Sequence, residues 1–561
     1  MMKRNLHLLT NHQFDLLIIG GGIYGACVAW DAAQRGLSVA LIEQNDFGSA
    51  TSANSLKFIH GGLRYLQDGR LPLVRRMTLE RKNWLRIAPH LVRPMPILVP
   101  TLPKLTRSRL ALGAALRFNN WIGLDRNRGL PPAQWLGDGR LLNRAQYQEQ
   151  AGWIDPQATG AALWYDAQML NSERLLLSFI LAAANRGAVV ANYVQATDFV
   201  GDRELAGITA VDTLINQPLE IRARLIVNCA GAWTDELLAL LNDRLGRRRI
   251  PHPPSLALNL ITHRLPPQAT IGVISPSGQM LFIAPWRDVT LIGTWHKAIA
   301  HHAADSHLTE DLIQTCLNDI NAAYPPANLS RADIRHIHTG FLPAYDKAEP
   351  VRLLREGVIY DHGRDGSDGL PNLITVLGVK YTTARWLAQQ AVDLALKKLG
   401  HASIPCHTAH TPLPGGEMPD FVSFLEEVMT TRPSTIPDQT MHHLVSTYGA
   451  LYPQLLSLVA ENPAWGEPVT TNSPVIKAEV IHAIRHDMAQ TLSDVVMRRT
   501  ELGAAGLPEI GAIQTCAALA AAELGWDKTR CHQEIEEMLH QSPISNLLIS
   551  NLPSALTTGK P

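Results

Sequence analysis

The first pattern along the chain is a continuous apolar run that ends in glycines. Residues 16–19 enter Gly20-Gly21-Gly22, and a helical pattern over 26–35 and a second apolar run over 37–42 follow. A buried strand, a glycine turn, a helix and another buried strand are typical of a β-α-β unit in a parallel sheet. An acidic residue, Glu43, follows the second strand at a spacing of 18 positions from Gly25.

Each part of this unit has a physical role in holding a dinucleotide. Gly20 permits the tight turn, Gly22 lets backbone approach a pyrophosphate, and Gly25 lets the helix pack closely on the strand. The helix N-terminus offers free N–H groups to phosphates, and a carboxylate after the second strand accepts hydrogen bonds from a ribose. The sequence therefore predicts a dinucleotide site that includes Gly20, Gly22, Ile23, Tyr24, Gly25 and Glu43.

Further along, the pattern alternates between helical and strand-like periods. It predicts a helical basic region to about residue 130, a helix over 173–186, a strand over 188–196, a hairpin over 203–221 and a strand, small-residue turn and helix over 223–241. Short alternating runs over 256–295 predict antiparallel strands. A helix over 308–323, strands over 335–341 and 358–361, and a strand, glycine and helix over 372–399 follow, before a helical remainder.

A chain of 561 residues is too long for one hydrophobic core. We expect an α/β protein in which a discontinuous Rossmann-like domain is joined by an antiparallel-sheet substrate domain and a C-terminal all-helical domain. The predicted boundaries are 14–245 for the first part of the Rossmann-like domain, with a basic helical insertion at 66–130, 246–345 for the substrate (cap) domain, 346–400 for the closing part, and 415–545 for the helical domain.

Composition narrows the class of protein. Hydrophobic residues make up 46% and charged residues 18%, which is typical of a globular protein. The six cysteines form no C-x-x-C pair, which argues against a disulfide framework, a thiolate zinc site and an iron–sulfur cluster and favours reduced thiols in the cytoplasm. Histidines near 296–307 and 407–410 match no metal-binding spacing, so no metal site is expected. No signal peptide and no apolar run of about 20 residues is present, so no membrane span is expected.

Charge is unevenly distributed although the formal net charge is zero. Residues 64–130 contain fourteen Lys or Arg and only three Asp or Glu, and residues 105–124 mix these cations with Leu, Phe and Trp. This pattern indicates either a basic amphipathic segment on an anionic lipid surface or the solvated face of an ordinary helix. No nucleic-acid-binding motif accompanies it, so nucleic acid is not expected as a partner.

Four segments resemble the FAD-dependent glycerol-3-phosphate dehydrogenase family, within the D-amino-acid-oxidase-like flavoproteins. Residues 50–66 read A-T-S-A-N-S-L-K-F-I-H-G-G-L-R-Y-L, which is similar to that family's small polar run and its K-L-I-H-G-G-L-R-Y-L signature. Residues 378–385 resemble its G-G-K-L-T-T-Y-R segment, and 484–488 with 494–500 resemble its C-terminal helical domain. The resemblance covers nearly the whole chain.

The resemblance implies a non-covalently held FAD and oxidation of a secondary alcohol by hydride transfer to flavin. The implied substrate is sn-glycerol 3-phosphate, with electrons passed to a membrane quinone and lipid contact through residues 70–128, at the inner face of the cytoplasmic membrane. The implied cofactor-binding residues, beyond those of the glycine turn, are Thr51, Ser52, Ser55, Lys57, His60, Gly61, Gly62, Ala230, Gly231, Gly378, Lys380, Thr382 and Thr383. The implied substrate-binding residues are Arg64, Tyr65, Arg355 and Lys380.

The chain departs from the family pattern at the substrate side. Leu342 stands where the family's S-G-V-R-P-L segment carries an arginine, and His296 stands where an acidic residue is usual. The family's histidine before its second sheet has only a loose match in His263, so the catalytic base is not assigned, and His296 is a candidate proton acceptor. Two other interpretations stay open: a related flavin enzyme for a different hydroxy acid, polyol or amine, and a non-enzymatic flavin-holding protein.

Overall fold

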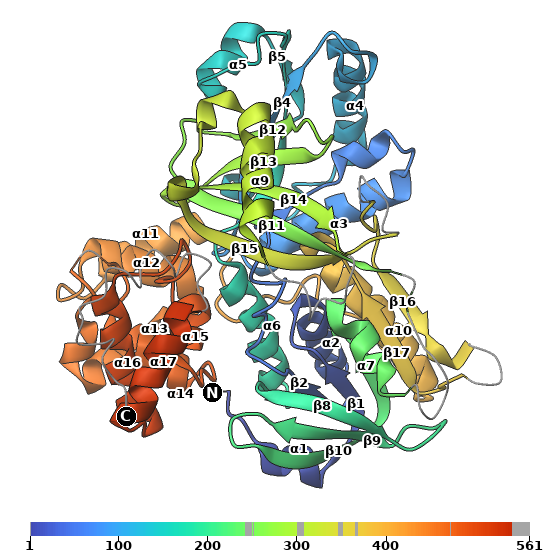
Figure 1. Ribbon diagram of the computed structural model, residues 1–561, viewed down its shortest axis with the longest axis vertical. Helices are drawn as coiled ribbons and strands as arrows, with labels where there is room; N and C mark the ends of the chain where they lie inside the picture. The colour runs from blue at the N-terminus through green and yellow to red at the C-terminus, as the bar shows by residue number, and fades with distance from the viewer. Residues whose placement is uncertain are drawn as a thin grey trace.

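The computed structural model describes residues 2–241, 250, 252–299, 308–345, 352–364, 369–471 and 473–540. Two sheets lie one above the other, and a group of helices packs beside them (Figure 1). The lower sheet carries the N-terminal strand, the upper sheet carries the middle of the chain, and the helical group at the left carries the C-terminal part. This architecture confirms the predicted fold class.

The lower sheet is built around the apolar strand predicted at the start of the chain. Its path is β16-β17-β10-β1-β2-β7, with β8 and β9 added as an antiparallel extension of β10. The strands β1, β2, β7, β10 and β17 run parallel to one another. The bounds are β1 (Gln13–Ile19), β2 (Val39–Ile42), β7 (Val189–Ala191), β8 (Val194–Val200), β9 (Gly207–Asp212), β10 (Gln217–Asn228), β16 (Val358–Asp361) and β17 (Leu373–Leu377).

Apolar helices cover this sheet. Helix α2 (Ile23–Gln34) lies between α6 (Ser172–Asn185) and α10 (Ala384–Lys398), and its side chains are buried almost all round. Short helices α1 (Leu6–Asn11) and α7 (Thr234–Ala239) complete the domain. The strand predicted over 188–196 is two strands, β7 and β8, because the chain turns between them at Tyr193, whose φ is +58°.

The upper sheet is larger than predicted. Its path is β15-β11-β14-β13-β12-β4-β6-β3 with β5 beside β6, and all its pairs are antiparallel except β12 with β4. The bounds are β3 (Phe58–Ile59), β4 (Val92–Thr101), β5 (Arg140–Leu142), β6 (Gly160–Met169), β11 (Pro254–His263), β12 (Thr270–Ile274), β13 (Met280–Trp286), β14 (Val289–Ala298) and β15 (Ile334–Pro343).

Two sequence interpretations are corrected by this sheet. The region 66–130 is not wholly helical, because β4 separates α3 (Leu71–Ile87) from α4 (Arg109–Ile122). The sheet is also not confined to 246–345, because β3 to β6 contribute almost half of its strands. The pattern of β4 was hidden by the three prolines at positions 94, 96 and 100, because proline is unusual inside a strand.

One helix covers the far face of the upper sheet. Helix α9 (Glu310–Ala323) packs Ile313, Leu317 and Ile320 on β11 to β14. The opposite face is turned toward the lower sheet and α2 (Figure 1). A short helix, α5 (Arg144–Ala151), covers the strands at the top. A chemical site between the two sheets therefore receives one wall from each.

The C-terminal helices form their own cores beside both sheets. These helices are α11 (Phe421–Thr431), α12 (Asp438–Tyr448), α13 (Tyr452–Glu461), α14 (Lys477–Arg485), α15 (Leu492–Asp494), a π-helical turn (Val495–Arg499), α16 (Ile510–Leu524) and α17 (Lys528–His540). The predicted boundaries at 245, 346 and 545 fall outside the described residues, so the exact domain limits stay a prediction. Within the described ranges, no helix combines the length and apolarity that crossing a membrane requires.

Candidate active site: a cavity between the two sheets

A cavity of about 1200 Å³ lies between the carboxyl ends of the parallel strands and the inner face of the upper sheet. Fourteen of the residues predicted to bind the cofactor line it: Gly20, Gly22, Ile23, Tyr24, Glu43, Thr51, Ser52, Ser55, His60, Gly62, Ala230, Gly231, Gly378 and Lys380. The other predicted substrate residues, Arg64, Tyr65 and Arg355, line it too. Ligands of open α/β sheets bind at this edge of the sheet.

The glycines of the first turn are required by close approach of backbone. A Cβ on Gly25 would stand 1.9 Å from the carbonyl oxygen of Gly20, so only glycine lets α2 start so near β1. Gly20 has a φ of +108° and lies against the backbone of Cys229. Gly22 faces the cavity, where a Cβ would meet only Ser52 Oγ, at 3.3 Å. Gly25 itself does not line the cavity and acts by packing.

Glu43 lines one end of the cavity, the end at which the sequence predicts the nucleotide and which we call the nucleotide end. Its carboxylate accepts hydrogen bonds from the backbone N–H of Gly21 (2.7 Å) and of Asn45 (3.0 Å). Burial raises the pKa of Glu43, although these two N–H groups oppose the rise. Sequence reasoning missed Val194 and Gln195, which line the same end from β8. The sequence pattern did not single out these two residues, because it predicts one continuous strand over 188–196 and therefore no separate β8.

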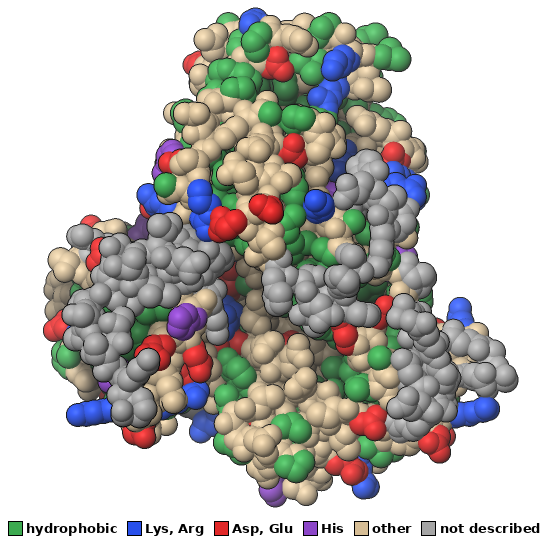
Figure 2. Space-filling view, viewed as in Figure 1, with side chains coloured by type: hydrophobic (Ala, Val, Ile, Leu, Met, Phe, Trp, Pro, Cys, Tyr) green, Lys and Arg blue, Asp and Glu red, His purple; other side chains and the backbone are tan. Residues whose placement is uncertain are grey.

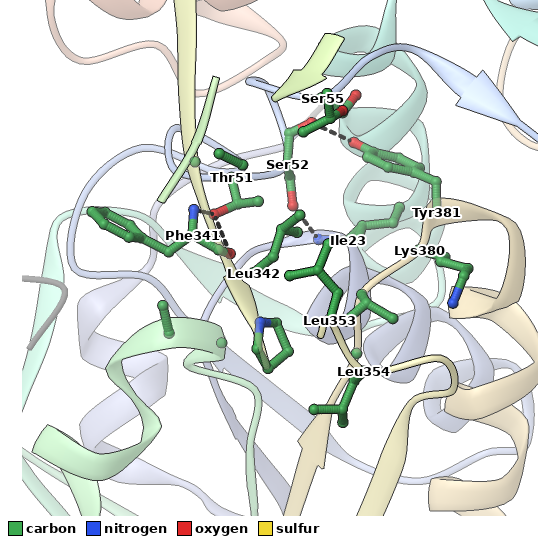
Figure 3. Close-up of a pocket in the computed structure, with 18 of the residues that line it drawn as sticks. Ile23, Thr51, Ser52, Ser55, Phe341, Leu342, Leu353, Leu354, Lys380 and Tyr381 are labelled. Carbon is green, nitrogen blue, oxygen red and sulfur yellow. Dashed lines mark hydrogen bonds between the residues drawn. The ribbon is translucent and has the colours of Figure 1, made fainter. Parts of the chain in front are cut away.

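The hydroxyl loop at 51–55 joins the two walls of the cavity (Figure 3). Ser52 Oγ accepts from the N–H of Ile23 at 3.0 Å, at the first residue of α2. Thr51 Oγ1 accepts from the N–H of Phe341 at 2.9 Å and donates to its carbonyl at 3.2 Å, which ties the loop to β15. The Tyr381 hydroxyl donates to the carbonyl of Ser52 at 3.0 Å. The loop is thus held against the N-terminus of α2, and helix N-termini are favourable places for phosphates.

Lys57 is not brought to the cavity. Its side chain is fully buried, and its ammonium donates to Glu173 Oε1 (2.6 Å), Ser172 Oγ (2.7 Å) and the carbonyl of Ala53 (2.7 Å). Lys57 has a φ of +62°, which turns the chain from the hydroxyl loop into β3. Its role in the structure is to fix the loop from behind, and its predicted contact with the cofactor is corrected.

The histidine and glycines of the signature are held by buried partners. The N–H of His60 donates to Thr382 Oγ1 at 3.0 Å, and the N–H of Gly61 donates to Asp166 Oδ1 at 2.6 Å. Asp166 also receives the Arg81 guanidinium. The His60 ring faces the cavity, and burial lowers the pKa of His60 to about 3, so its imidazole is neutral. Gly61, Thr382 and Thr383 lie behind the cavity wall.

The start of α10 packs against Tyr24. A Cβ on Gly378 would stand 1.8 Å from the Tyr24 ring, which explains the glycine after β17. The Tyr24 hydroxyl donates to the carbonyl of Lys380 (2.8 Å) and accepts from its N–H (3.0 Å). The helix itself begins at Ala384, after a 3₁₀ turn over 381–383. Ala230 and Gly231 face them from the end of β10, and a Cβ on Gly231 would meet nothing.

Two of the cationic residues predicted to bind substrate, Arg64 and Lys380, lie at the Tyr65 ring. The Arg64 guanidinium lies 5.1 Å and the Lys380 ammonium 5.2 Å from the centre of the Tyr65 ring. Arg64 Nη2 donates to the Tyr65 hydroxyl at 3.3 Å, and Lys380 donates to the carbonyl of Arg355. The Arg355 guanidinium is paired with Asp68 at 2.9 Å. Burial of Tyr65 is outweighed by the Lys380 and Arg64 charges, which hold the pKa of Tyr65 below its usual value.

The upper sheet supplies polar groups that sequence reasoning largely missed. Asn259 of β11 donates to the carbonyl of Asn54 (3.0 Å) and accepts from the Thr294 hydroxyl of β14 (2.8 Å). His296 is two residues beyond Thr294 on the same face and also lines the cavity. Gln279 binds the backbone of His296 on both sides, at 2.8 and 2.9 Å. The period-two pattern of 289–298 was the available signal.

Leu342 and His263 lie in different surroundings. Leu342 lines the cavity with Leu353 and Leu354, on the side next to Ile23 (Figure 3). His263 stands at the outer end of β11, half exposed, with Nδ1 3.7 Å from Asp333, and does not line the cavity. Among the described residues no group of three or more His, Cys, Asp or Glu could hold a metal ion. His301, His302 and His307 lie outside those residues.

The cavity fits FAD by its shape and its donors. Its glycine turn would admit a pyrophosphate at Gly22, Glu43 would accept hydrogen bonds from a ribose, and the hydroxyl loop leads from there to the upper sheet. The cation group around Tyr65 lies at the other end, with His60 and His296. An FAD molecule bound here supplies a flavin ring that accepts a hydride, and the residues around that ring bind and orient the compound that gives it.

Comparison with known proteins gives the same assignment. Residues 15–394 match the family described as FAD dependent oxidoreductase, and residues 406–531 match the C-terminal domain of alpha-glycerophosphate oxidase. The chain is 31% identical to a glycerol-3-phosphate dehydrogenase of Synechocystis sp., over 95% of this chain and 97% of that one. It is 30% identical to the Mycobacterium leprae glycerol-3-phosphate dehydrogenase, over 93% and 87%.

A solved structure shows the same fold over the whole length. The glycerol-3-phosphate dehydrogenase of Bacillus halodurans, complexed with FAD, superposes with a TM-score of 0.75 at 24% identity, over 96% of each chain. The cavity, its glycine turn and the family matches agree on the cofactor, which is FAD. The chain therefore belongs to the FAD-dependent glycerol-3-phosphate dehydrogenase family and is an FAD-dependent oxidoreductase of that type.

Proposed function

We propose that the protein oxidises sn-glycerol 3-phosphate to dihydroxyacetone phosphate with FAD as hydride acceptor. The observation that carries this proposal is the group of Arg64, Tyr65 and Lys380, where two cations share one tyrosine at the cavity wall. Such a group suits a phosphate, because charge-assisted hydrogen bonds to an oxyanion are strong and directional. The names of the relatives at about 30% identity support the same substrate.

The test is an anaerobic substrate screen that follows the flavin absorbance of the purified protein. Glycerol 3-phosphate is expected to bleach the flavin, and unphosphorylated glycerol is expected to leave it oxidised at the same concentration. Bleaching by both would remove the phosphate from the recognition mechanism. Bleaching by neither, combined with bleaching by an amine, a hydroxy acid or another polyol, would establish the alternative substrate class.

A specific observation favours keeping that alternative. The wall at Leu342, Leu353 and Leu354 is apolar, in a place where the family pattern leads one to expect a substrate arginine (Figure 3). Loss of one charge-assisted partner costs about 1.5–3 kcal/mol. A substrate with an apolar group toward Leu342 would recover part of that free energy by burial.

Neutralising the phosphate site is expected to weaken substrate binding more than the reaction itself. Each of the variants Arg64→Gln and Lys380→Met should lower kcat/KM for glycerol 3-phosphate by about 10- to 150-fold, mainly through KM, because a charge-assisted bond contributes about 1.5–3 kcal/mol. Steady-state kinetics with a dye acceptor measures this. Arg70→Gln, which breaks only the exposed pair with Glu356, is the matched control and should stay near wild type. An unchanged KM in both variants would contradict the assignment.

The proton acceptor we assign is His296, the histidine that the upper sheet places in the cavity. Its Nδ1 is buried without a hydrogen-bond partner, and its backbone is fixed by Gln279. Burial, with a smaller contribution from the Arg64 charge, lowers the pKa of His296 to about 4, so the imidazole is neutral and free to accept a proton. His60 is less suited, because burial, together with the Lys380, Arg64 and Arg81 charges, outweighs Asp166 and lowers the pKa of His60 further, to about 3.

The electron acceptor we propose is a membrane quinone reached through a lipid-bound face. The lipid-contact surface expected over residues 70–128 can be restricted to a shorter segment, because many cations of this region already have partners within the protein. Those that bind a carboxylate or a carbonyl are Arg70, Arg75, Arg81, Lys82, Arg109 and Arg126. The exposed part is residues 104–124, which we call the α4 face. Its exposed apolar side chains are Leu105, Leu110, Phe118, Trp121 and Leu124.

The α4 face is suited to an anionic bilayer and is continuous with the cavity wall. Trp121 is 65% and Leu110 85% exposed, and Lys104 and Arg117 of the same segment are exposed too. Figure 2 shows blue and green side chains together at the upper right, where α4 lies. On its inner side the same helix turns Leu112 and Ala115 into the cavity. One helix therefore borders both the proposed lipid surface and the site of electron transfer.

Weakening the α4 face is expected to release the protein from lipid. The double variant Leu110→Gln with Trp121→Gln, and separately Lys104→Gln with Arg117→Gln, should each reduce cosedimentation with anionic vesicles by about fivefold or more, since each charge near the surface contributes about 1 kcal/mol. Dye-linked activity should be unchanged, while activity with a vesicle-embedded quinone should fall. Arg203→Gln with Arg222→Gln, on the lower sheet, is the charge-matched control. Unchanged cosedimentation of both double variants with anionic vesicles would show that the α4 face is not the lipid-binding surface.

A further inference from the structure

The nucleotide end of the cavity is held from outside by the C-terminal helices. Glu43, Gln44 and Asn45 line the cavity, and the next residue, Asp46, is turned away from it and is 1% exposed. Arg499 donates to both oxygens of Asp46, at 2.6 and 2.7 Å, and Arg498 Nε donates to Oδ2 at 2.5 Å. A carboxylate beside the cofactor is thus bound by residues about 450 positions later in the chain.

Both arginines belong to the π-helical turn Val495–Arg499, a rare form of helix that is frequent at functional sites. Although they are adjacent in the chain, their guanidinium groups reach the same carboxylate. Arg499 Nε also donates to the carbonyl of Asp487 at 2.9 Å, so each of its three nitrogens makes a hydrogen bond.

The contact is part of a closed network that reaches the cavity backbone. Arg498 Nη2 donates to Asp494 Oδ1 at 2.6 Å, and the Tyr193 hydroxyl donates to the same oxygen at 2.7 Å. The N–H of Tyr193 in turn donates to the carbonyl of Asn45 at 3.0 Å, and the next N–H, of Val194, donates to the carbonyl of Glu43 at 2.8 Å. Both ends of the Glu43–Asn45 segment are therefore tied to the C-terminal helices.

The segment that follows Glu43 is also hydrogen-bonded to the glycine turn between β1 and α2. The N–H of Gly48 donates to the carbonyl of Gly21 at 3.1 Å, and the N–H of Gly21 donates to Glu43 at 2.7 Å. Any shift of residues 43–48 would thus move both the carboxylate at the ribose position and the turn at the phosphates. The network is neutral, because the buried Asp46 and Asp494 are balanced by the buried Arg499 and the partly buried Arg498. Loss of either arginine would leave a buried carboxylate without its full charge partner.

We propose that Arg498 and Arg499 are positioning residues for FAD: by binding Asp46 they fix the segment 43–48, so that tight binding of FAD requires the docked C-terminal helices. Burial of Asp46 would raise its pKa, but the Arg499 and Arg498 charges outweigh burial and lower the pKa of Asp46 to about 2. Asp46 therefore stays ionised, and its ion pairs with Arg498 and Arg499 persist, throughout the neutral pH range. The inference depends on the cofactor alone and not on the substrate, so it stands or fails separately from the proposed reaction.

The experiment measures the affinity of the deflavinated full-length protein for FAD, by titration with flavin fluorescence, together with the melting temperature of the FAD-free protein. Arg499→Lys keeps the charge and removes the two-pronged contact, and Arg498→Gln removes the second donor. Each is expected to weaken FAD binding by about tenfold or more, within the usual range of coupling between sites. The matched control is Glu501→Gln, which breaks the contact of the same helical domain with Arg287 on the upper sheet.

In the control, FAD affinity should stay within about twofold of wild type even where the melting temperature falls. Equal loss of affinity in Glu501→Gln and Arg499→Lys would overturn the assignment to Asp46, because general loosening of the domain would then explain both. If the arginine variants do not fold, Tyr193→Phe removes only the hydroxyl bound to Asp494, and an affinity loss of about threefold is expected. An unchanged affinity in a folded variant of Arg498, Arg499 or Tyr193 would also overturn it.

Discussion

Replacing His296 by glutamine is expected to lower kcat for glycerol 3-phosphate by about 100- to 10,000-fold, the usual contribution of a general base. The reason is the position of its ring, which lines the cavity on the same sheet face as Asn259 and Thr294. The buried Nδ1 of this ring makes no hydrogen bond within the described residues. Glutamine fills similar space but cannot take the alcohol proton. Single-turnover flavin reduction measures the effect on the chemical step.

The pH dependence gives a second readout of the same assignment. Because the pKa of His296 is lowered to about 4, kcat/KM should rise as pH increases through about 4 and carry no further contribution from His296 above it. The substrate phosphate has its own ionisation near pH 6, which should appear in wild type and variant alike. A bound phosphate beside Arg64 offsets the charge of that cation, so the rise of kcat with pH that depends on His296 should lie at higher pH than the rise of kcat/KM. In His296→Gln only these two rises should disappear from the pH profiles.

A matched histidine serves as control. His263→Gln alters a half-exposed ring at the outer end of β11, paired with Asp333, and should leave kcat unchanged. FAD content should be normal in both variants. A His296→Gln enzyme with wild-type kcat and an unchanged pH profile would remove His296 from the reaction and leave His60 as the histidine to test in the cavity.

Replacing Gly25 by valine is expected to give a protein that holds no FAD after purification, a loss of affinity of more than about a hundredfold, or about 2.7 kcal/mol. A Cβ at this position would stand 1.9 Å from the carbonyl oxygen of Gly20, which is backbone and cannot rotate away. Helix α2 must then move off β1, and its N-terminus moves away from the pyrophosphate position. The absorbance of bound flavin and a titration with added FAD measure the loss.

Two further glycines separate cofactor binding from folding. Gly511→Ala, on α16, places a Cβ where nothing lies within 4 Å and should bind FAD normally. Gly22→Ala meets only Ser52 Oγ at 3.3 Å, so the protein should fold, yet the methyl group points to the cavity and should weaken FAD binding. Full FAD occupancy in both Gly22→Ala and Gly25→Val would contradict the assignment of this turn to the pyrophosphate.

Local patterns sufficed where a residue acts through its own backbone. Gly20, Gly22 and Gly25 were identifiable because a strand, a turn and a helix must follow one another at short spacing to hold a pyrophosphate. The antiparallel strands over 256–295 were identifiable from alternation, because one face of each is buried. The predicted strand at 188–196 was less accurate, because the turn at Tyr193 has a left-handed backbone conformation. Such a conformation is usually indicated by a glycine, and here the residue is a tyrosine.

Residues that act through distant partners could not be placed in this way. Lys57 lies inside the signature, yet its ammonium is directed to Glu173, and only the fold shows that α6 passes behind the loop. Strand β4 was expected to be helical, because its pairing with β6 and β12 is a long-range contact. Asp46 carried no sequence signal at all, although two arginines of the C-terminal helices bind it.

The sequence by itself determined the class of cofactor, the parallel sheet that holds it and the presence of a helical C-terminal domain, because these follow from short-range backbone requirements and from motifs that lie within one segment. Only the tertiary structure decided which polar side chains share the cavity, that His296 faces it while His263 does not, and that the C-terminal helices hold the nucleotide end. The physical reason is that side-chain direction and pairing across sheets and domains depend on contacts between residues hundreds of positions apart.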